Sequence, residues 1–177
     1  PQNPKTPFIL KIIHFDLYNL IIKLKNMSFP AFDMFHAHCA MKVEFKEASC
    51  LKAFDIMKDD GYNWHPEPKA GGNYAVYDAI EEENLWLTRT TPTKHYVDDI
   101  LFDFLPPNPE NFRVAGCTVA AKSRSRSLSY YDYETNFCNM YNVLQNVGEQ
   151  SALDSLTTSD CKWVPQKEDI ATTCAKY

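Results

Sequence analysis

The chain has 177 residues, a length that ordinarily folds as one domain. Hydrophobic residues make up 45% and charged residues 23% of it, which is ordinary globular composition and excludes a disordered tail, a collagen-like rod and a low-complexity repeat. The formal net charge is −5, so we expect no nucleic-acid partner held by general electrostatic attraction.

Residues 1–38 are set apart as an apolar leader or N-terminal extension, and one domain is expected over 39–177. Residues 8–24 are strongly apolar, but Lys11, His14, Asp16 and Lys23 interrupt them. They therefore match neither a membrane span nor a signal peptide. One face of a helix drawn through this segment would carry Ile9, Leu10, Ile13, Leu17, Leu20, Ile21 and Leu24. Such a helix could dock on the domain or join a second copy into an oligomer; alternatively, Met27 is the true start.

The six cysteines contain no C-x-x-C pair, which zinc knuckles and thioredoxin-type sites require; they are Cys39, Cys50, Cys117, Cys138, Cys161 and Cys174. An even number without metal spacing favours disulfides in an oxidising compartment over six buried free thiols. We predict at least two disulfides that include Cys161 or Cys174. The Cys161–Cys174 link is slightly preferred over a link back to Cys39 or Cys50.

A glycosylation sequon, Asn26-Met27-Ser28, agrees with secretion.

The pattern of apolar residues predicts an α+β fold. Residues 41–45 alternate as a half-buried strand, and residues 50–60 have helical spacing that ends at Gly61. Further strands follow over short connections, at residues 74–80, 85–90, 96–105 and 112–133. We expect a curved, meander-like antiparallel sheet of about four to six strands, with one main helix packed on its concave face.

Residues 135–148 give a weaker helix prediction, because asparagine is a poor helix former.

Small residues alternate onto one face of the last long strand: Cys117, Val119, Ala121, Ser123, Ser125 and Ser127. Either another element packs closely there, or these residues line a ligand cavity. The opposite face carries Lys122, Arg124 and Arg126, which fit a solvated basic face better than a phosphate site.

The sequence Tyr96-Val97-Asp98-Asp99 resembles the YxDD box of reverse transcriptases, where adjacent aspartates help to hold two metal ions. About six residues match, and the acidic chain lacks the framework of that family. We therefore interpret the two aspartates as solvated residues of a strand. His95 beside them gives a minor alternative, an enzyme that uses His95 with Asp98 or Asp99 as acid–base groups.

The pair His36-x-His38 with Asp33 lacks an evident further metal ligand, so no metal site is predicted. No catalytic residue and no cofactor are assigned either, because no nucleophile, phosphate-loop or metalloprotease motif occurs.

Aromatic residues make up 14% of the chain, and they form either a ring-rich core or an aromatic pocket. Combined with the small-residue face, the pocket interpretation gives eight candidate ligand-binding residues: Trp64, Tyr74, Trp86, Tyr96, Ser123, Ser125, Ser127 and Tyr131.

Several short runs over residues 39–177 resemble small cysteine-containing secreted animal proteins of no assigned function. These runs are Thr90-Thr91-Pro92, Tyr96-Val97-Asp98-Asp99, Ser125-x-Ser127 and Asp132-Tyr133-x-Thr135-Asn136-Phe137-Cys138-Asn139. The resemblance implies disulfides and secretion, and no activity.

The function expected from the sequence is a non-enzymatic secreted binding protein that holds a small apolar or aromatic ligand in a cavity between sheet and helix. The alternative is a structural or protein-interaction module.

Overall fold

The computed structural model describes residues 28–176, and the compact unit of the chain begins at Ala31. The expectations for the helical face over residues 8–24, for a start at Met27 and for a sequon at Asn26 fall outside the described residues.

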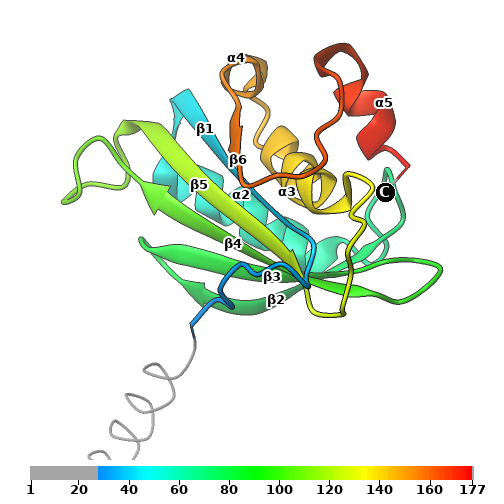
Figure 1. Cartoon of the computed structure of the whole chain (residues 1–177). Coiled ribbons are helices and arrows are strands. Elements are labelled where there is room, and N and C mark those ends of the chain that lie inside the picture. The colour runs from blue at the N-terminus through cyan, green and yellow to red at the C-terminus, as the bar shows by residue number, and fades with distance from the viewer. Residues whose placement is uncertain (1–27, 177) are drawn as a thin grey trace, which may run out of the picture. The chain divides into compact units, whose positions relative to one another are not determined.

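In the part of the chain that the structure describes, six antiparallel strands form one open sheet in the order β2-β3-β4-β5-β1-β6 (Figure 1). The strands are β1 (His38–Ser49), β2 (Asn73–Ile80), β3 (Asn84–Thr90), β4 (Val97–Leu105), β5 (Ala115–Ser125) and β6 (Thr157–Ser159). Strands β2 to β5 form the predicted meander, since their short connections allow antiparallel neighbours. Strand β1 then pairs with β5, and β6 adds to its free edge.

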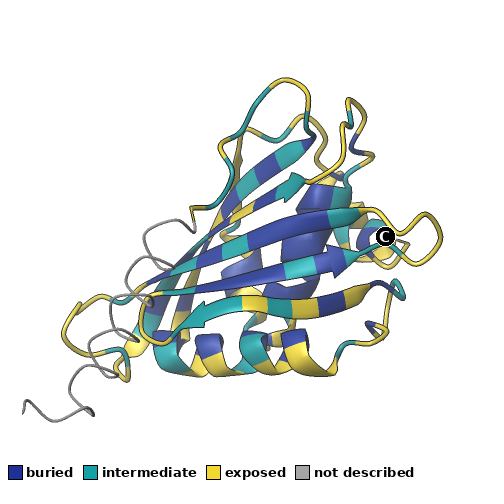
Figure 2. Ribbon diagram, turned by 90° about the horizontal axis from the view of Figure 1, so that it is seen from below, coloured by how far each residue is buried: buried dark blue, intermediate teal, exposed yellow. Residues whose placement is uncertain are grey.

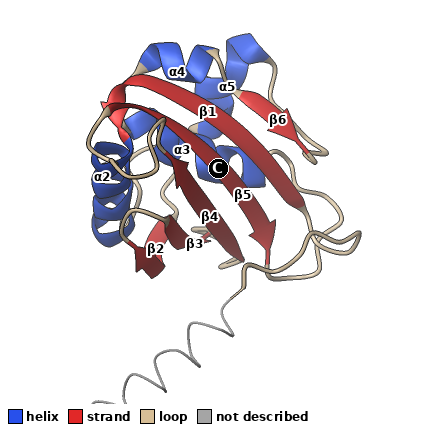
Figure 3. Ribbon diagram, turned by 90° about the vertical axis from the view of Figure 1, so that its left-hand side faces the viewer, coloured by secondary structure: helices blue, strands red, loops and turns tan. Residues whose placement is uncertain are grey.

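Two long helices pack on one face of the sheet and against each other: α2 (Cys50–Asn63) and α3 (Thr135–Asn146) (Figure 3). The Ser49 side chain accepts a hydrogen bond from the Lys52 amide and caps α2. Shorter helices follow α3, namely α4 (Gln150–Asp154), η1 (Lys167–Asp169) and α5 (Ile170–Cys174).

The hydrophobic core lies between the sheet and these two helices. Alternate residues of β1, Met41, Val43 and Phe45, are buried, as the alternating sequence predicts (Figure 2). Phe54 of α2 meets Phe104 of β4 edge to face within this core. The prediction of an α+β fold with an antiparallel sheet is therefore confirmed.

The small residues of β5 allow the helices to approach the sheet closely. Cys117 is bonded to Cys50 of α2, and Ser123 Oγ donates to Asn136 Oδ1 of α3 at 2.7 Å. Close packing therefore accounts for this part of the small-residue face.

All six cysteines are paired, as Cys39–Cys161, Cys50–Cys117 and Cys138–Cys174. This confirms the prediction of at least two disulfides that include a tail cysteine. The slight preference for Cys161–Cys174 is wrong. Because β6 pairs with β1, Cys161 lies beside Cys39, while Cys174 ends a helix that packs on α3.

No helix among the described residues has the length and apolar character needed to cross a membrane.

Candidate functional site

A pocket of about 590 Å³ lies at the end of the sheet where β3 turns into β4 and β5 ends. Its walls come from the β3–β4 turn, from the segment between β5 and α3, and from Lys176 near the C-terminus. These segments are far apart in the sequence and meet because β5 is the neighbour of β4.

The mouth of the pocket is aromatic. Its lining includes Tyr96 of the turn and three tyrosines of the following segment, Tyr130, Tyr131 and Tyr133. These four side chains are 52–65% exposed. The rings of Tyr130 and Tyr131 meet edge to face, and those of Tyr131 and Tyr133 are stacked. The mouth therefore offers flat apolar surface with hydroxyl groups at its edge.

The inner wall is charged and buried, in contrast to the mouth. Arg89 of β3 and Asp98 of β4 are cross-strand partners and both line the pocket. Arg89 is 0% and Asp98 is 2% exposed. The pocket lining therefore combines exposed tyrosines with two charged side chains that are covered from solvent.

Hydrogen bonds use both carboxylate oxygens of Asp98. Ser125 Oγ donates to Oδ1 at 2.6 Å, and Asn139 Nδ2 of α3 donates to Oδ2 at 2.8 Å. Burial raises the pKa of Asp98, and these two hydrogen bonds lower it only in part. Asp98 is thus held in place by the sheet and by α3.

Arg89 has no such partners. Within the described residues, none of its three guanidinium nitrogens makes a hydrogen bond. The carboxylate of Glu67 lies 3.8 Å from Nη2, and the Tyr74 ring centroid lies 5.7 Å from Cζ. Gly72 allows the guanidinium to lie there, because a Cβ at this position would be 2.5 Å from Nε.

Asp132 adds a third buried charged group to the lining. Its Oδ1 accepts hydrogen bonds from the amide and the side chain of Asn136, whereas Oδ2 has no partner within the described residues. Burial raises the pKa of Asp132 to about 6. Asp132 also lines a second pocket of about 250 Å³ beside His38.

Four of the eight predicted ligand-binding residues line the larger pocket: Tyr96, Ser125, Ser127 and Tyr131. The other four do not. Trp64 and Tyr74 meet edge to face at the core, and Ser123 binds α3. Trp86 donates from Nε1 to Asp99 at 2.9 Å.

Sequence analysis missed Arg89, which is buried on the same side of β3 as Leu85 and Leu87. A charged residue on the apolar face of a strand was the signal available for it.

The two adjacent aspartates of the YVDD sequence are buried, so the expectation that they are solvated is wrong. Asp98 lines the pocket, whereas Asp99 accepts hydrogen bonds from Trp86 and from Arg126. Successive strand residues point to opposite faces, so the pair does not converge on one ion. No group of three potential metal ligands occurs among the described residues.

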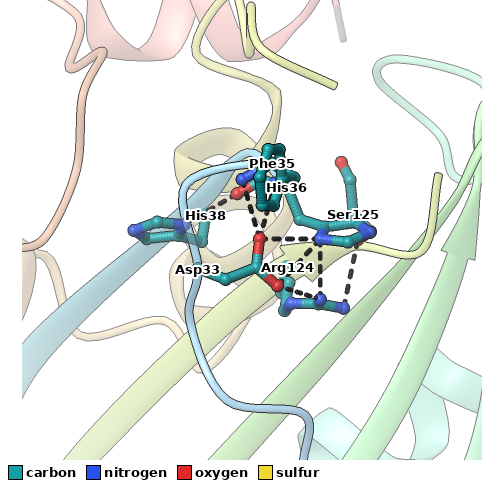
Figure 4. A network of polar contacts seen from close by, with 6 residues as sticks. All are labelled: Asp33, Phe35, His36, His38, Arg124 and Ser125. Atoms are coloured by element: carbon teal, nitrogen blue, oxygen red, sulfur yellow. Dashed lines mark hydrogen bonds and ion pairs between the residues drawn. The ribbon is translucent and has the colours of Figure 1, made fainter. Parts of the chain in front are cut away.

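His95 is exposed in the β3–β4 turn, and within the described chain no hydrogen bond joins it to Asp98 or Asp99. The other two histidines of interest lie in a separate cluster around Arg124 (Figure 4). Arg124 Nη2 donates to Asp33 Oδ2 at 2.7 Å and lies 2.8 Å from His36 Nδ1. Arg124 and His36 hold the pKa of Asp33 well below its usual range.

His38 Nδ1 instead contacts the carbonyl oxygen of His36, at 2.8 Å, and its ring stacks on Phe32. The two imidazoles therefore have separate partners. The contacts of Asp33 and His36 with Arg124 link the segment before β1 to β5.

The other cations on and just after β5 are also paired. Lys122 lies 3.9 Å from Asp103, and Arg126, the residue after β5, binds Asp99 at 2.7 Å. Lys122 and Arg126 are partly exposed, whereas Arg124 is largely buried, so the expected solvated face does not include Arg124.

The chain matches no protein-family model and no curated protein. Among solved structures it is similar to a conserved protein from Geobacillus kaustophilus, with a TM-score of 0.42 and 8% identity. That similarity covers 68% of this chain and 98% of the other.

Proposed function

We propose that the protein is a non-enzymatic, secreted binding protein that holds a small ligand with a flat apolar or aromatic body. The observation that carries this proposal is the pocket of about 590 Å³ with tyrosines at its mouth. Small-molecule sites commonly have a volume of about 300–1,000 Å³, an aromatic lining and a few placed polar groups.

The tyrosines explain why the ligand should be flat. The exposed faces of these aromatic rings can stack on a flat ligand, and the contact removes apolar surface from water. Ser125 and Ser127 are small, so they leave room between the mouth and the inner wall.

Secretion is supported by the three disulfides, since such bonds persist mainly in oxidising compartments. A binding role rather than catalysis is supported by the state of the acid–base candidates. Asp98 and Asp99 are buried and bonded to neighbouring side chains, and within the described residues no hydrogen bond joins either of them to the exposed His95. The acid–base pair that the alternative requires is therefore not assembled.

The test uses three probes that share a naphthalene ring: naphthalene-2-acetic acid, its primary amide, and 2-(2-naphthyl)ethylamine. Each is titrated into isotopically labelled protein and followed by NMR. We expect at least one probe to shift resonances of residues 91–96 and 125–133 while resonances of α2 remain unchanged.

The double variant Tyr96→Ala/Tyr131→Ala should weaken this binding about tenfold, because stacking surface is lost from the mouth. Tyr62→Ala is the matched control, since Tyr62 is also exposed but lies on α2 away from the pocket. The proposal is overturned if no probe binds, or if the double variant binds as tightly as the Tyr62 variant.

A further inference from the structure

The inner wall of the pocket contains a cation whose hydrogen-bonding capacity is unused. The Arg89 side chain is 0% exposed, and Nε, Nη1 and Nη2 all lack a hydrogen-bond partner within the described residues. A guanidinium carries five N–H donors in a planar fork. Burying such donors without acceptors costs free energy, so this arrangement favours the arrival of an acceptor.

The neighbouring side chains do not supply that acceptor. Glu67 Oε2 lies 3.8 Å from Nη2, beyond hydrogen-bond distance, and Asn142 donates to its other oxygen. Asp98 accepts hydrogen bonds from Ser125 and Asn139, and none joins it to Arg89 within the described residues. Arg89 therefore lines the pocket with a guanidinium that has no hydrogen-bond acceptor within the described residues.

We propose that the ligand carries a carboxylate, which Arg89 binds at the inner wall while the flat body of the ligand lies among the tyrosines of the mouth. This inference rests on the proposed function and names the substrate class for the same pocket, a small aromatic carboxylic acid. Arginine suits this role, because its planar fork matches the two oxygens of a carboxylate.

The other charged residues of the pocket also favour a ligand that carries a carboxylate. Lys94 and Lys176 line the pocket together with Arg89, which gives three cations. Asp98 and Asp132 are the carboxylates of the lining, so the three cations outnumber them. A ligand amine would instead bring a like charge towards the guanidinium, and a neutral amide offers a single acceptor oxygen.

The experiment compares the three naphthalene probes by isothermal titration at pH 7. We expect the acid to bind at least about tenfold more tightly than the amide, and the amine to bind most weakly. Equal binding of acid and amide through the tyrosines would overturn this inference and leave the proposed function standing. Absence of binding by all three probes would overturn both.

The decisive variant is Arg89→Met/Glu67→Gln, which removes both partners of the buried ion pair together. In this variant the acid and the amide should bind within about threefold of each other. The matched control is Arg126→Met, since Arg126 is bound to Asp99 outside the pocket, and it should retain the preference for the acid. A preference retained by the first variant overturns the proposal.

Two further measurements distinguish binding by Arg89 from a folding defect of the variant and from binding by the surface lysines. In the unmodified protein, saturation with the acid should shift the Nε–H resonance of Arg89, and an unmoved resonance would overturn the proposal. The variant Lys94→Gln/Lys176→Gln should keep most of the preference. If it abolishes the preference, the lysines bind the acid and the assignment to Arg89 is wrong.

Discussion

Asp60 shows how a single buried carboxyl group joins the two long helices. It lies on α2, is 5% exposed, and accepts a hydrogen bond from Asn146 Nδ2 of α3 at 2.7 Å. Its other oxygen has no partner within the described residues. Burial therefore raises the pKa of Asp60 to about 7.

This shift predicts a specific pH dependence. An unfolded aspartate has a pKa of about 3.9, so the folded protein binds the proton more tightly, and this contribution to stability is lost as the pH rises through about 7. Asp60→Asn keeps an acceptor for Asn146 and removes the titration. We expect it to raise the free energy of unfolding at pH 8 by about 2 kcal/mol and to have little effect at pH 4.

Urea unfolding at the two pH values measures this difference. The exposed Asp55 on the same helix is the control, and Asp55→Asn should leave both values within about 0.5 kcal/mol. A stabilisation by Asp60→Asn that is the same at pH 4 and pH 8 would contradict the prediction.

Gly61 is required by the close contact of α2 with the sheet. A Cβ at this position would lie 2.7 Å from Leu87 Cδ2 and 2.8 Å from Val76 Cγ2. Gly61→Ala should therefore destabilise the protein by about 1–3 kcal/mol, although alanine is the better helix former by about 1 kcal/mol. Thermal unfolding measures the change. Asp55→Ala, on the exposed side of α2, is the control and should not lower the stability comparably.

At the scale of elements, the end of β1 is stabilised by the side chain of Glu149, the residue before α4. The register of β1 against β5 is irregular between Phe45 and Ser49. There the Glu149 carboxylate accepts hydrogen bonds from the amides of Lys46, Glu47 and Ala48 at 2.7–3.2 Å. Partial burial raises the pKa of Glu149, but these three hydrogen bonds outweigh it and the net shift is downward.

Glu149→Ala should consequently cost about 1–3 kcal/mol of stability at pH 7, because three backbone donors lose a charged acceptor. The contribution is present above the unfolded pKa and is lost as the pH falls through the lowered folded pKa. Chemical unfolding at pH 7 and pH 3 measures both effects. The control is Glu81→Ala in an exposed turn; an equal loss in both variants would contradict the role given to Glu149.

Elements with a strong periodic pattern could be predicted from the sequence, whereas α3 could only be predicted weakly. Strand β1 alternates regularly, and α2 has a capping serine and regular helical spacing, although the helix continues past Gly61 to Asn63. The asparagines of α3 lower helix propensity in isolation, yet Asn136, Asn139 and Asn142 are buried and bonded to other elements. Tertiary hydrogen bonds therefore outweigh the local preference there.

The same contrast between local pattern and tertiary contact decides which residues of the candidate site could be predicted. Tyr96 and Tyr131 could be proposed from aromatic composition because both fell on predicted strands, at residues 96–105 and 112–133. Arg89 could not be paired with a pocket, since its environment depends on the approach of segments far away in the sequence. The disulfide preference failed for the same reason, because β6 places Cys161 beside a strand more than 100 residues earlier.

At the scale of the whole molecule, the three disulfides join segments that are far apart in the sequence. Cys39–Cys161 spans 122 residues, Cys50–Cys117 spans 67, and Cys138–Cys174 spans 36. Peptide mapping without reduction should yield these three cross-links and no alkylated thiol. A substantial fraction of free cysteine, or a Cys161–Cys174 peptide, would contradict the pairing.

The variant Cys39→Ala/Cys161→Ala should lower the free energy of unfolding by about 2–5 kcal/mol, as is usual for loss of a native disulfide. Since β6 has three residues, we also expect faster proteolysis within residues 155–166. Urea unfolding and limited proteolysis measure the two effects. Unchanged cleavage of this segment would show that β6 does not depend on the bond.

The Cys138–Cys174 bond has a consequence for how the pocket is assayed. Lys176, which forms part of the pocket wall, lies two residues after Cys174, and the disulfide fastens this end of the chain to α3. If a thiol reductant broke this bond, packing on α3 and the hydrogen bond from Asn142 Nδ2 to the Cys174 carbonyl oxygen would be left to hold the tail. A ligand screen should therefore use the oxidised protein, in which the covalent link to this wall of the pocket is intact.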